Sequence, residues 1–146
     1  MNDDEKHTLP VSSAVTAAGV KHALLSYHYQ DIGDIDGYAS LLDNDVTFEH
    51  PGTPARRGAN EVLKAQADQA TLCSRHELVR VVAENDTVVV LGRLVRSVPD
   101  GTVPGPLGVD FADVFTLSAR SLLRTCRRYY FAAPSGRPGQ VAPEDM

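Results

Sequence analysis

One acidic residue stands in the middle of the most apolar strand that this sequence predicts. Residues 109–117 read VDFADVFTL, and the alternation places Val109, Phe111, Asp113, Phe115 and Leu117 on one face. An ionised carboxylate among such neighbours is costly unless it has a partner. We therefore expect Asp113 to be kept as the neutral acid, to have a hydrogen-bonding partner, or to border a water-filled cavity. Each of these surroundings suits an acid–base catalyst, whereas a solvent-facing position beside a loop would indicate no special role.

The composition is that of one globular domain. The chain has 146 residues, of which 42% are hydrophobic and 23% are charged, and this is enough for one core. A formal net charge of −5 argues against a nucleic-acid partner, and no apolar run is long enough to span a membrane. The acidic, polar start (MNDDEKH) is unlike a secretory signal. Cys73 and Cys126 suit reduced thiols rather than a disulfide, so we expect a cytoplasmic protein.

The first predicted helix has a face that either joins the core or covers a cavity. The helix begins near Ser12 or Ser13 and ends at Gly33, and its apolar positions recur at helical spacing. This face carries Val11, Val15, Ala18, His22, Leu25, Tyr29 and Ile32, and Ser26 borders it. The side chains of His22, Ser26 and Tyr29 are core-edge residues in the first case and cavity-lining residues in the second.

Two more helices and one short strand precede a run of strands. Asp34 can cap a helix over residues 35–42, and another helix is predicted over residues 59–72. Between them, Val46, Phe48 and His50 share one face of a short strand. Further strands are predicted over residues 76–83, 87–97, 109–117 and 122–131, and residues 98–108 form a Pro/Gly-rich candidate lid. Strands gathered after helices indicate an α+β fold with helices on one face of an antiparallel sheet.

Five segments stand in an order and spacing that one family shares. They read GDIDG (33–37), LLDNDVTFEHPG (41–52), RG (57–58), RHELVRVVAENDTVVV (75–90) and FADVFTL (111–117). Together they resemble the SnoaL-like polyketide cyclases, within the superfamily that includes nuclear transport factor 2 and ketosteroid isomerase. The resemblance implies a cone-shaped, curved antiparallel sheet wrapped by three N-terminal helices, with an internal pocket and pairing into a homodimer. We take residues 10–131 as this domain, 1–9 as a disordered leader and 132–146 as a flexible tail.

The resemblance assigns roles to two residues. The isomerase branch has a catalytic carboxylate immediately before the proline of a motif like FEHPG, and here that place holds His50. A histidine there keeps a general base. The same branch and the cyclases have a cavity aspartate in the strand matched by FADVF, which is Asp113. The isomerase branch also has a tyrosine on the first helix where this chain has Ser26, so the resemblance does not imply a steroid-type isomerisation.

Other residues are secondary candidates. Phe48, Phe111 and Phe115 would form apolar walls for a ligand, and His76 is either a cavity-mouth histidine or a surface residue at a strand end. A register slip of one residue would exchange Glu49 for His50. Arg93 and Arg96 lie on opposite strand faces, so one of them can point inward as an anion or enolate stabiliser. The basic set Arg120, Arg124, Arg127 and Arg128 is expected to form a solvated face and part of a dimer surface.

These residues point to an enzyme without metal or cofactor. We predict a cyclase or isomerase of bacterial secondary metabolism that acts on a polyketide-like, hydrophobic small molecule. His50 would remove a proton next to a carbonyl group, and Asp113, kept protonated by Phe111 and Phe115, would donate to the enolate oxygen; the two roles could be reversed. A second hypothesis is epoxide opening, by water or by an internal hydroxyl group, with the same pair. A third is a carrier that binds a hydrophobic metabolite without turnover.

Overall fold

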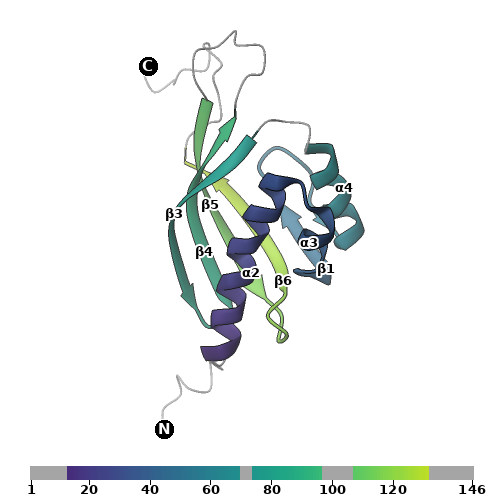
Figure 1. Ribbon diagram of the computed structural model, residues 1–146, viewed down its shortest axis with the longest axis vertical. Coiled ribbons are helices and arrows are strands. Elements are labelled where there is room, and N and C mark those ends of the chain that lie inside the picture. The colour runs from purple at the N-terminus through teal and green to yellow at the C-terminus, as the bar shows by residue number, and fades with distance from the viewer. Residues whose placement is uncertain (1–12, 70–73, 97–106, 132–146) are drawn as a thin grey trace.

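The computed structural model describes residues 13–69, 74–96 and 107–131, and these form helices packed on one strongly curved sheet. The helices are α2 (Ser13–Ile32), α3 (Ile35–Ala39) and α4 (Ala59–Gln69). The strands are β1 (Leu42–Glu49), β2 (Arg56–Arg57), β3 (Ser74–Glu84), β4 (Thr87–Arg96), β5 (Leu107–Leu117) and β6 (Leu123–Tyr130). In Figure 1, α2 runs across the sheet while α3 and α4 lie beside β1. The predicted α+β cone is confirmed.

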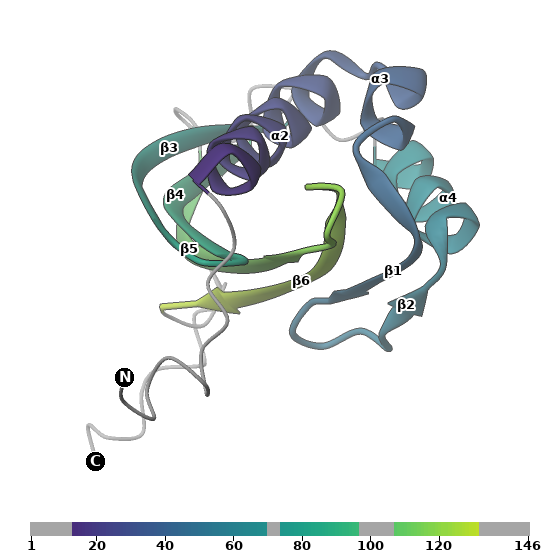
Figure 2. The same cartoon turned by 90° about the horizontal axis from the view of Figure 1, so that it is seen from below.

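The sheet has the strand order β2-β1-β6-β5-β4-β3 and is open at its edges. Figure 2 shows it curling around α2. Of its strand pairs, only β1 and β6 run parallel in the described part of the chain. The predicted antiparallel arrangement therefore holds for the strand pairs β3–β4, β4–β5 and β5–β6. Strand β1 departs from it, because it runs parallel to β6. Strand β2 has no counterpart among the elements predicted from the sequence.

The register decides which side chains face α2. Val90, Asp113 and Arg128 lie opposite one another on β4, β5 and β6, and the neighbouring row contains Val88, Phe115 and Cys126. These six side chains are buried. The predicted alternation of residues 109–117 is therefore correct, because Phe111, Asp113, Phe115 and Leu117 are all buried on the inner face.

The face of α2 that packs on the sheet is displaced by one residue from the face that the spacing of apolar residues predicts. Its buried residues are Ala23, Ser26 and Tyr27, whereas Ile32 is 59% exposed. Gly19 belongs to the same face, since a Cβ atom there would overlap the side chain of Leu117. Small side chains let the helix approach the sheet closely, and counting large apolar residues does not detect such a face.

The helix ends follow the predicted signals. Gly33 has φ +76°, and its N–H group donates to the carbonyl oxygen of Gln30, which closes α2. The side chain of Asp34 then accepts from the N–H group of Gly37 and caps α3. The sharp turn between α2 and α3 places the last residues of α2 beside the open end of the cone. The predicted leader, lid and tail fall mainly or wholly on residues 1–12, 97–106 and 132–146, outside the described residues, as does Cys73.

Candidate functional site

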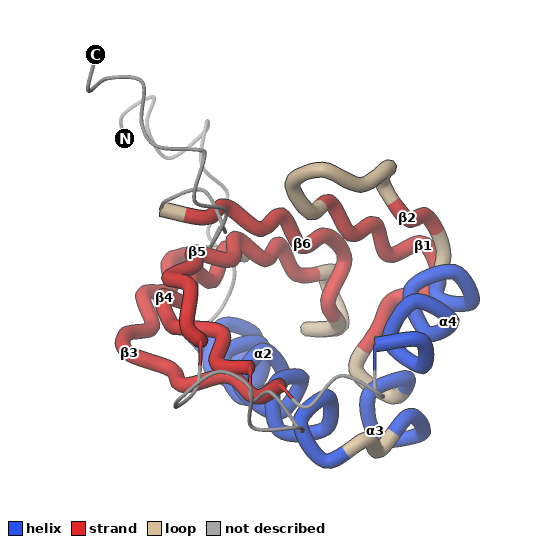
Figure 3. Tube along the Cα trace, turned by 90° about the horizontal axis from the view of Figure 1, so that it is seen from above, coloured by secondary structure: helices blue, strands red, loops and turns tan. Residues whose placement is uncertain are grey.

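A cavity of about 250 Å³ opens at the end of the cone where α2 ends. Figure 3 shows α2, α3, α4 and the curved sheet arranged around this end of the molecule. Its polar lining residues are Gln30, Asp31, His50, Thr53, Arg56, Gln66, Ser74, His76, Arg96 and Arg128. Its apolar and aromatic lining residues include Ile32, Tyr38, Phe48, Val62, Ala65, Leu94 and Tyr130. The cavity therefore combines an apolar wall with several charged and titratable side chains, as small-molecule sites do.

A histidine–aspartate pair lies in this lining. The Nδ1 atom of His76 is 2.7 Å from one carboxylate oxygen of Asp31, and the backbone N–H group of His76 donates to the other oxygen at 3.0 Å. A carboxylate only accepts, so Nδ1 carries a hydrogen, and in the neutral form of the ring the lone pair is on Nε2. The ring is also held edge-on against Tyr27 and Phe111, with centroid distances of 4.9 and 5.7 Å. This arrangement fixes the tautomer and orientation of a potential base.

His50 is the second histidine of the cavity. It follows the end of β1, and its ring lies 6.2 Å from that of Phe48, which also lines the cavity. Burial, and after it the positive charge of Arg128, lowers the pKa of His50 from 6.5 to about 4. The charge of Arg56 acts in the same direction, while Asp113 partly opposes it. His50 is therefore a neutral ring at neutral pH, able to accept or donate a hydrogen bond.

The lowered pKa of His50 makes the stability of the fold depend on pH. Between pH 6.5 and about 4 the unfolded chain binds a proton at His50 that the folded chain does not bind. The free energy of unfolding should therefore fall as the pH is lowered through this window. Urea unfolding of the wild type and of His50→Gln at several pH values tests this, and the variant should lose less stability on acidification. His28→Gln, at an exposed position of α2, is the control. Identical pH profiles for wild type and His50→Gln would contradict the expectation.

Arg128 lines the cavity, and its guanidinium group is held by Asp113. Its Nε and Nη2 atoms each donate to Asp113 at 2.8 Å, and the hydroxyl group of Tyr27 donates to the same carboxylate at 2.6 Å. The guanidinium carbon lies 4.1 Å from the ring centroid of Phe111. Burial disfavours the charged group, but the hydrogen bonds and charge of Asp113 more than offset this, and the pKa of Arg128 is raised. Burial and the charge of Asp113 raise the pKa of Tyr27, which therefore stays protonated as a donor.

Asp113 lies in this buried network and does not line the cavity. The carboxylate has the hydrogen-bonding partners that its apolar strand demands, but it is not among the described residues that line the cavity. It accepts hydrogen bonds from Arg128 and Tyr27, whereas the role suggested from the sequence was that of a protonated donor to an enolate. Phe111 and Phe115 are likewise buried in the core and absent from the cavity lining. Arg128 stands between this layer and the cavity.

Three predicted ligand-binding residues on α2 also lie elsewhere. The Nδ1 atom of His22 is 2.7 Å from the carbonyl oxygen of Ser121, at the turn between β5 and β6. The hydroxyl group of Ser26 donates to the carbonyl oxygen of Ala23 within the helix. Tyr29 packs against the hydrophobic core near Gly37. None of the three lines the cavity, whereas His50, His76 and Phe48 do.

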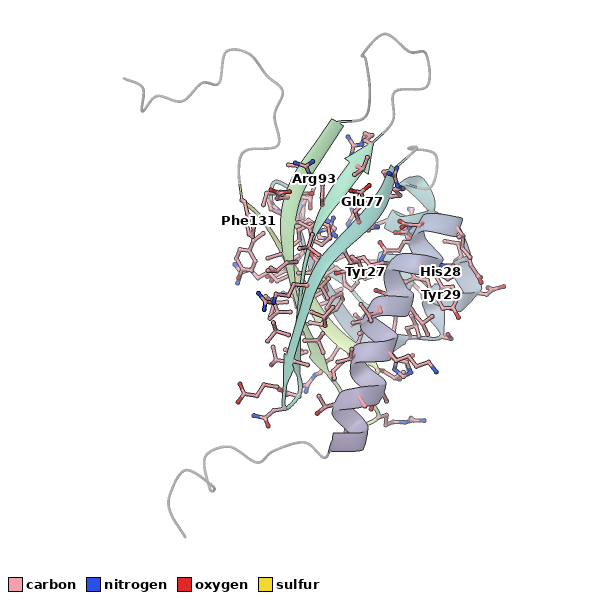
Figure 4. The ribbon with its side chains drawn as sticks, turned by 60° about the vertical axis from the view of Figure 1, so that its left-hand side comes forward. Tyr27, His28, Tyr29, Glu77, Arg93 and Phe131 are labelled. Atoms are coloured by element: carbon pink, nitrogen blue, oxygen red, sulfur yellow. The ribbon has the colours of Figure 1, made fainter. Side chains whose placement is uncertain are left out.

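Arg93, Arg96 and Glu49 differ in whether they line the cavity. Arg96 lines the cavity, and Arg93 lies on the outer face in an ion pair with Asp110, where Figure 4 labels it. Glu49 is paired with Arg127, so it does not replace His50 in the cavity. The expectation that Arg128 belongs to a solvated basic face is wrong, because Asp113 and Phe111 bury it on the inner face. Arg120, Arg124 and Arg127 are exposed as expected.

Sequence reasoning missed Tyr27, Asp31 and the role of Arg128, although each had a signal. Ala23, Tyr27 and Asp31 are spaced four residues apart and so form one row along α2. Arg128 lies on the same face of β6 as Cys126 and Tyr130, and the hairpin with β5 sets it opposite Asp113. A buried carboxylate predicts a cation directly across the strand pair, but only a known turn geometry identifies which one.

Three further features concern the described residues. They hold no cluster of three or more His, Cys, Asp or Glu side chains suited to a metal ion. No helix in residues 13–69, 74–96 or 107–131 has both the length and the apolar character needed to cross a membrane. Cys126 is buried with a free thiol, and burial raises its pKa well above the ordinary value.

Solved structures share this fold at low sequence identity. A putative SnoaL-like polyketide cyclase from Jannaschia sp. CCS1 is 18% identical, with a TM-score of 0.69 over 82% of this chain and 90% of that one. An epoxide hydrolase of the LEH-like type from M. tuberculosis is 15% identical, with a TM-score of 0.69 over 79% and 84% of the two chains. SalBIII, an epoxide hydrolase/cyclase-like enzyme of pyran ring formation in the polyether salinomycin, is 18% identical, with a TM-score of 0.66 over 77% and 89%.

The sequence comparisons agree with the structural ones. The chain matches none of the curated proteins at a significant level. The family model of the SnoaL-like domain matches residues 26–122, a span that runs from the middle of α2 to the turn after β5. The resemblance seen in the sequence motifs is thereby confirmed, and the chain belongs to the SnoaL-like domain family.

Proposed function

We propose that this chain is an acid–base enzyme that closes or isomerises a ring in a small oxygenated compound of bacterial secondary metabolism. One observation carries the proposal: the His76–Asp31 pair and Arg128 line the same cavity. A fixed base and a fixed cation are the two groups needed to form and hold an enolate. The cyclase-like enzymes among the structural neighbours are consistent with this chemistry on this fold.

His76 is the proposed base. Its Nε2 atom takes a proton from a carbon next to a carbonyl group, and the electron pair of the broken C–H bond moves onto the carbonyl oxygen. The positive charge that then develops on the ring is stabilised by Asp31, 2.7 Å from Nδ1. The enolate carbon attacks a second carbonyl group to close a ring, or the proton returns at another carbon to complete an isomerisation. In the first case the new alkoxide takes the proton back from His76.

Arg128 is the proposed stabiliser of the enolate oxygen. Two of its three nitrogen atoms are engaged by Asp113, which leaves Nη1 for a ligand in the cavity. Because Asp113, Tyr27 and Phe111 hold the group in place, no reorganisation is needed when charge develops on the substrate. Asp113 acts in this scheme as a positioning residue. His50, neutral at neutral pH, orients the substrate or serves as the second base.

The substrate we propose is small. The cavity volume of about 250 Å³ is below the range that drug-sized ligands occupy. Phe48, Leu94 and Tyr130 provide the wall against which a ring compound packs. A tetralone in deuterated water is a suitable probe, since its acidic C–H protons exchange for deuterium when a base removes them. The wild type should accelerate this exchange, as followed by NMR, and His76→Gln should not. Equal rates with both proteins would contradict the proposal.

Epoxide opening is the second candidate, favoured by the likeness to the epoxide hydrolase and to SalBIII. His76 would take the proton from water or from an internal hydroxyl group, and a tyrosine hydroxyl at the cavity, Tyr38 or Tyr130, would protonate the epoxide oxygen as its C–O bond breaks. Diol formation from styrene oxide, with deuterium exchange absent, would favour this reaction. Ligand binding with neither activity would favour the carrier hypothesis.

A second copy of the chain is the partner that we propose for the outer face of the sheet. Val82, Val89 and Val114 form one outward row, and Leu91, Ala112 and Tyr129 form the next. Val82 and Tyr129 are 53% and 46% exposed. Phe131, which Figure 4 labels on the same side, is 64% exposed. The Arg93–Asp110 pair beside these rows supplies both signs of charge, so two copies related by a twofold axis can exchange ion pairs.

Sedimentation of the wild type and of Tyr129→Glu tests this pairing. The wild type should sediment as a dimer, and a charge at the β6 end of the second apolar row should shift the variant toward the monomer. Val79→Glu, at the exposed bulge of β3, is the control and should remain dimeric. A monomeric wild type at tens of micromolar concentration would contradict a dimer of ordinary interface size.

A further inference from the structure

The cavity is positively charged although the chain as a whole is acidic. Of the described residues that line it, three are arginines, Arg56, Arg96 and Arg128, and one is a carboxylate, Asp31. The formal net charge of the chain is −5. A local excess of cations against this background attracts anions to the cavity mouth.

Among the residues that the structure describes, two of these cations, Arg56 and Arg96, have no partner of opposite charge. Arg128 is neutralised by Asp113, and Asp31 is engaged by His76. In the described part of the chain no carboxylate lies within ion-pair distance of Arg56 or Arg96. Arg56 and Arg96 are both exposed, so each keeps its hydration while the cavity is empty and needs no partner for folding.

Arg56 and Arg96 reach the cavity from different parts of the sheet. Arg56 belongs to the short strand β2, at one edge, and Arg96 ends β4, the fifth strand in the order. His50 and Arg56 are close enough for the charge of Arg56 to act on the histidine ring. Arg96 lies opposite Ser74, two residues before His76 on β3. The two arginines thus stand beside the two histidines of the cavity.

We infer that the substrate carries a carboxylate or an equally acidic oxygen group, which Arg56 and Arg96 bind at the cavity mouth. The inference shares its cavity with, and so rests on, the proposed function. A guanidinium group binds a carboxylate through two parallel hydrogen bonds, which fixes orientation as well as charge. With the anionic group held there, the ring packs against Phe48 and Leu94 and its carbonyl oxygen is directed toward Arg128. The substrate class is therefore an acidic ring compound rather than a purely hydrophobic one.

Titration calorimetry with a hydroxynaphthoic acid and with its methyl ester tests this inference. The two probes have the same ring system and differ in charge. The wild type should bind the acid about tenfold more tightly than the ester, or better, since hydrogen bonds to charged groups are the strong ones. The double variant Arg56→Gln/Arg96→Gln should lose this preference and bind the ester as the wild type does. Raising the salt concentration should weaken binding of the acid only.

Arg93→Gln is the matched control. It removes an arginine from the same strand as Arg96 but on the outer face, and it should keep the full preference for the acid. If the wild type binds the acid no more tightly than the ester, including the case in which it binds neither, the inference is wrong. It is also wrong if the double variant retains the preference. Because calorimetry needs no turnover, a charge preference without deuterium exchange would reject the catalytic proposal and would still show that Arg56 and Arg96 bind an acidic ligand.

Discussion

Replacement of Asp113 by Asn should lower the free energy of unfolding by about 3–5 kcal/mol, the largest effect on stability that we expect from a single change in this chain. The amide keeps the shape of the side chain but removes its charge, and Arg128 is then a buried cation without a counterion. The hydroxyl group of Tyr27 also loses its charged acceptor. Since small domains are stable by about 5–15 kcal/mol, such a loss is a large fraction of the total. Urea unfolding followed by circular dichroism measures it.

Asp110→Asn provides the matched control for this prediction. Asp110 lies on the same strand and also pairs with an arginine, Arg93, but on the outer face with both side chains about half exposed. An ion pair of that kind contributes about 0–1 kcal/mol, so the control should unfold almost as the wild type does. The double replacement Asp113→Leu/Arg128→Met, which removes both charges, should recover much of the lost stability. Equal, small effects of Asp113→Asn and Asp110→Asn would show that the buried pair does not hold the fold as we describe.

Replacement of His76 by Gln should lower the rate of a proton-abstraction reaction about 10²–10⁴-fold, the usual contribution of a positioned base. A nitrobenzisoxazole is a convenient substrate, because removal of its C–H proton breaks the N–O bond and releases a coloured cyanophenolate. The reaction needs only a base and a group to stabilise the developing oxyanion. Here His76 supplies the first and Arg128 the second.

The variant Asp31→Asn distinguishes a role of Asp31 in orienting His76 from a role in binding the ligand. Asn can present its amide N–H group to Nδ1, which would turn the histidine to the tautomer with its hydrogen on Nε2. We therefore expect a strongly reduced kcat with a nearly unchanged KM, as for a group that acts only in the transition state. His28→Gln, at an exposed histidine of the same helix, should behave as the wild type. A parallel rise in KM, with kcat preserved, would make Asp31 a ligand-binding residue instead.

The fold could be predicted because its signals are local and repeat along the chain. The alternation of residues 109–117, the glycine at position 33 and the cap at Asp34 each indicate one element by itself. The parallel pairing of β1 with β6 was not predictable in this way. It depends on the path of the whole chain, since the three strands of the intervening meander separate the two in sequence.

The candidate site was only partly predictable, and the reason lies in α2. Its large apolar and aromatic residues suggested a face through His22 and Tyr29, but the helix packs through Gly19, Ala23 and Ser26. This rotation directs Tyr27 toward Asp113 and Asp31 toward His76. Figure 4 shows Tyr27 between helix and sheet. The partners of Asp113 were therefore set by close packing of small residues, which a hydrophobicity pattern does not reveal.

The central claim, that His76 is a base held by Asp31 in a cavity with Arg128, is tested most directly by one comparison. The rate of nitrobenzisoxazole elimination is measured for the wild type and for His76→Gln, with folding of both checked by circular dichroism. Our account predicts saturable catalysis by the wild type and a loss of about 10²–10⁴-fold in the variant. Catalysis that survives in His76→Gln, or a folded wild type that binds the probe and does not accelerate its elimination, would contradict the account.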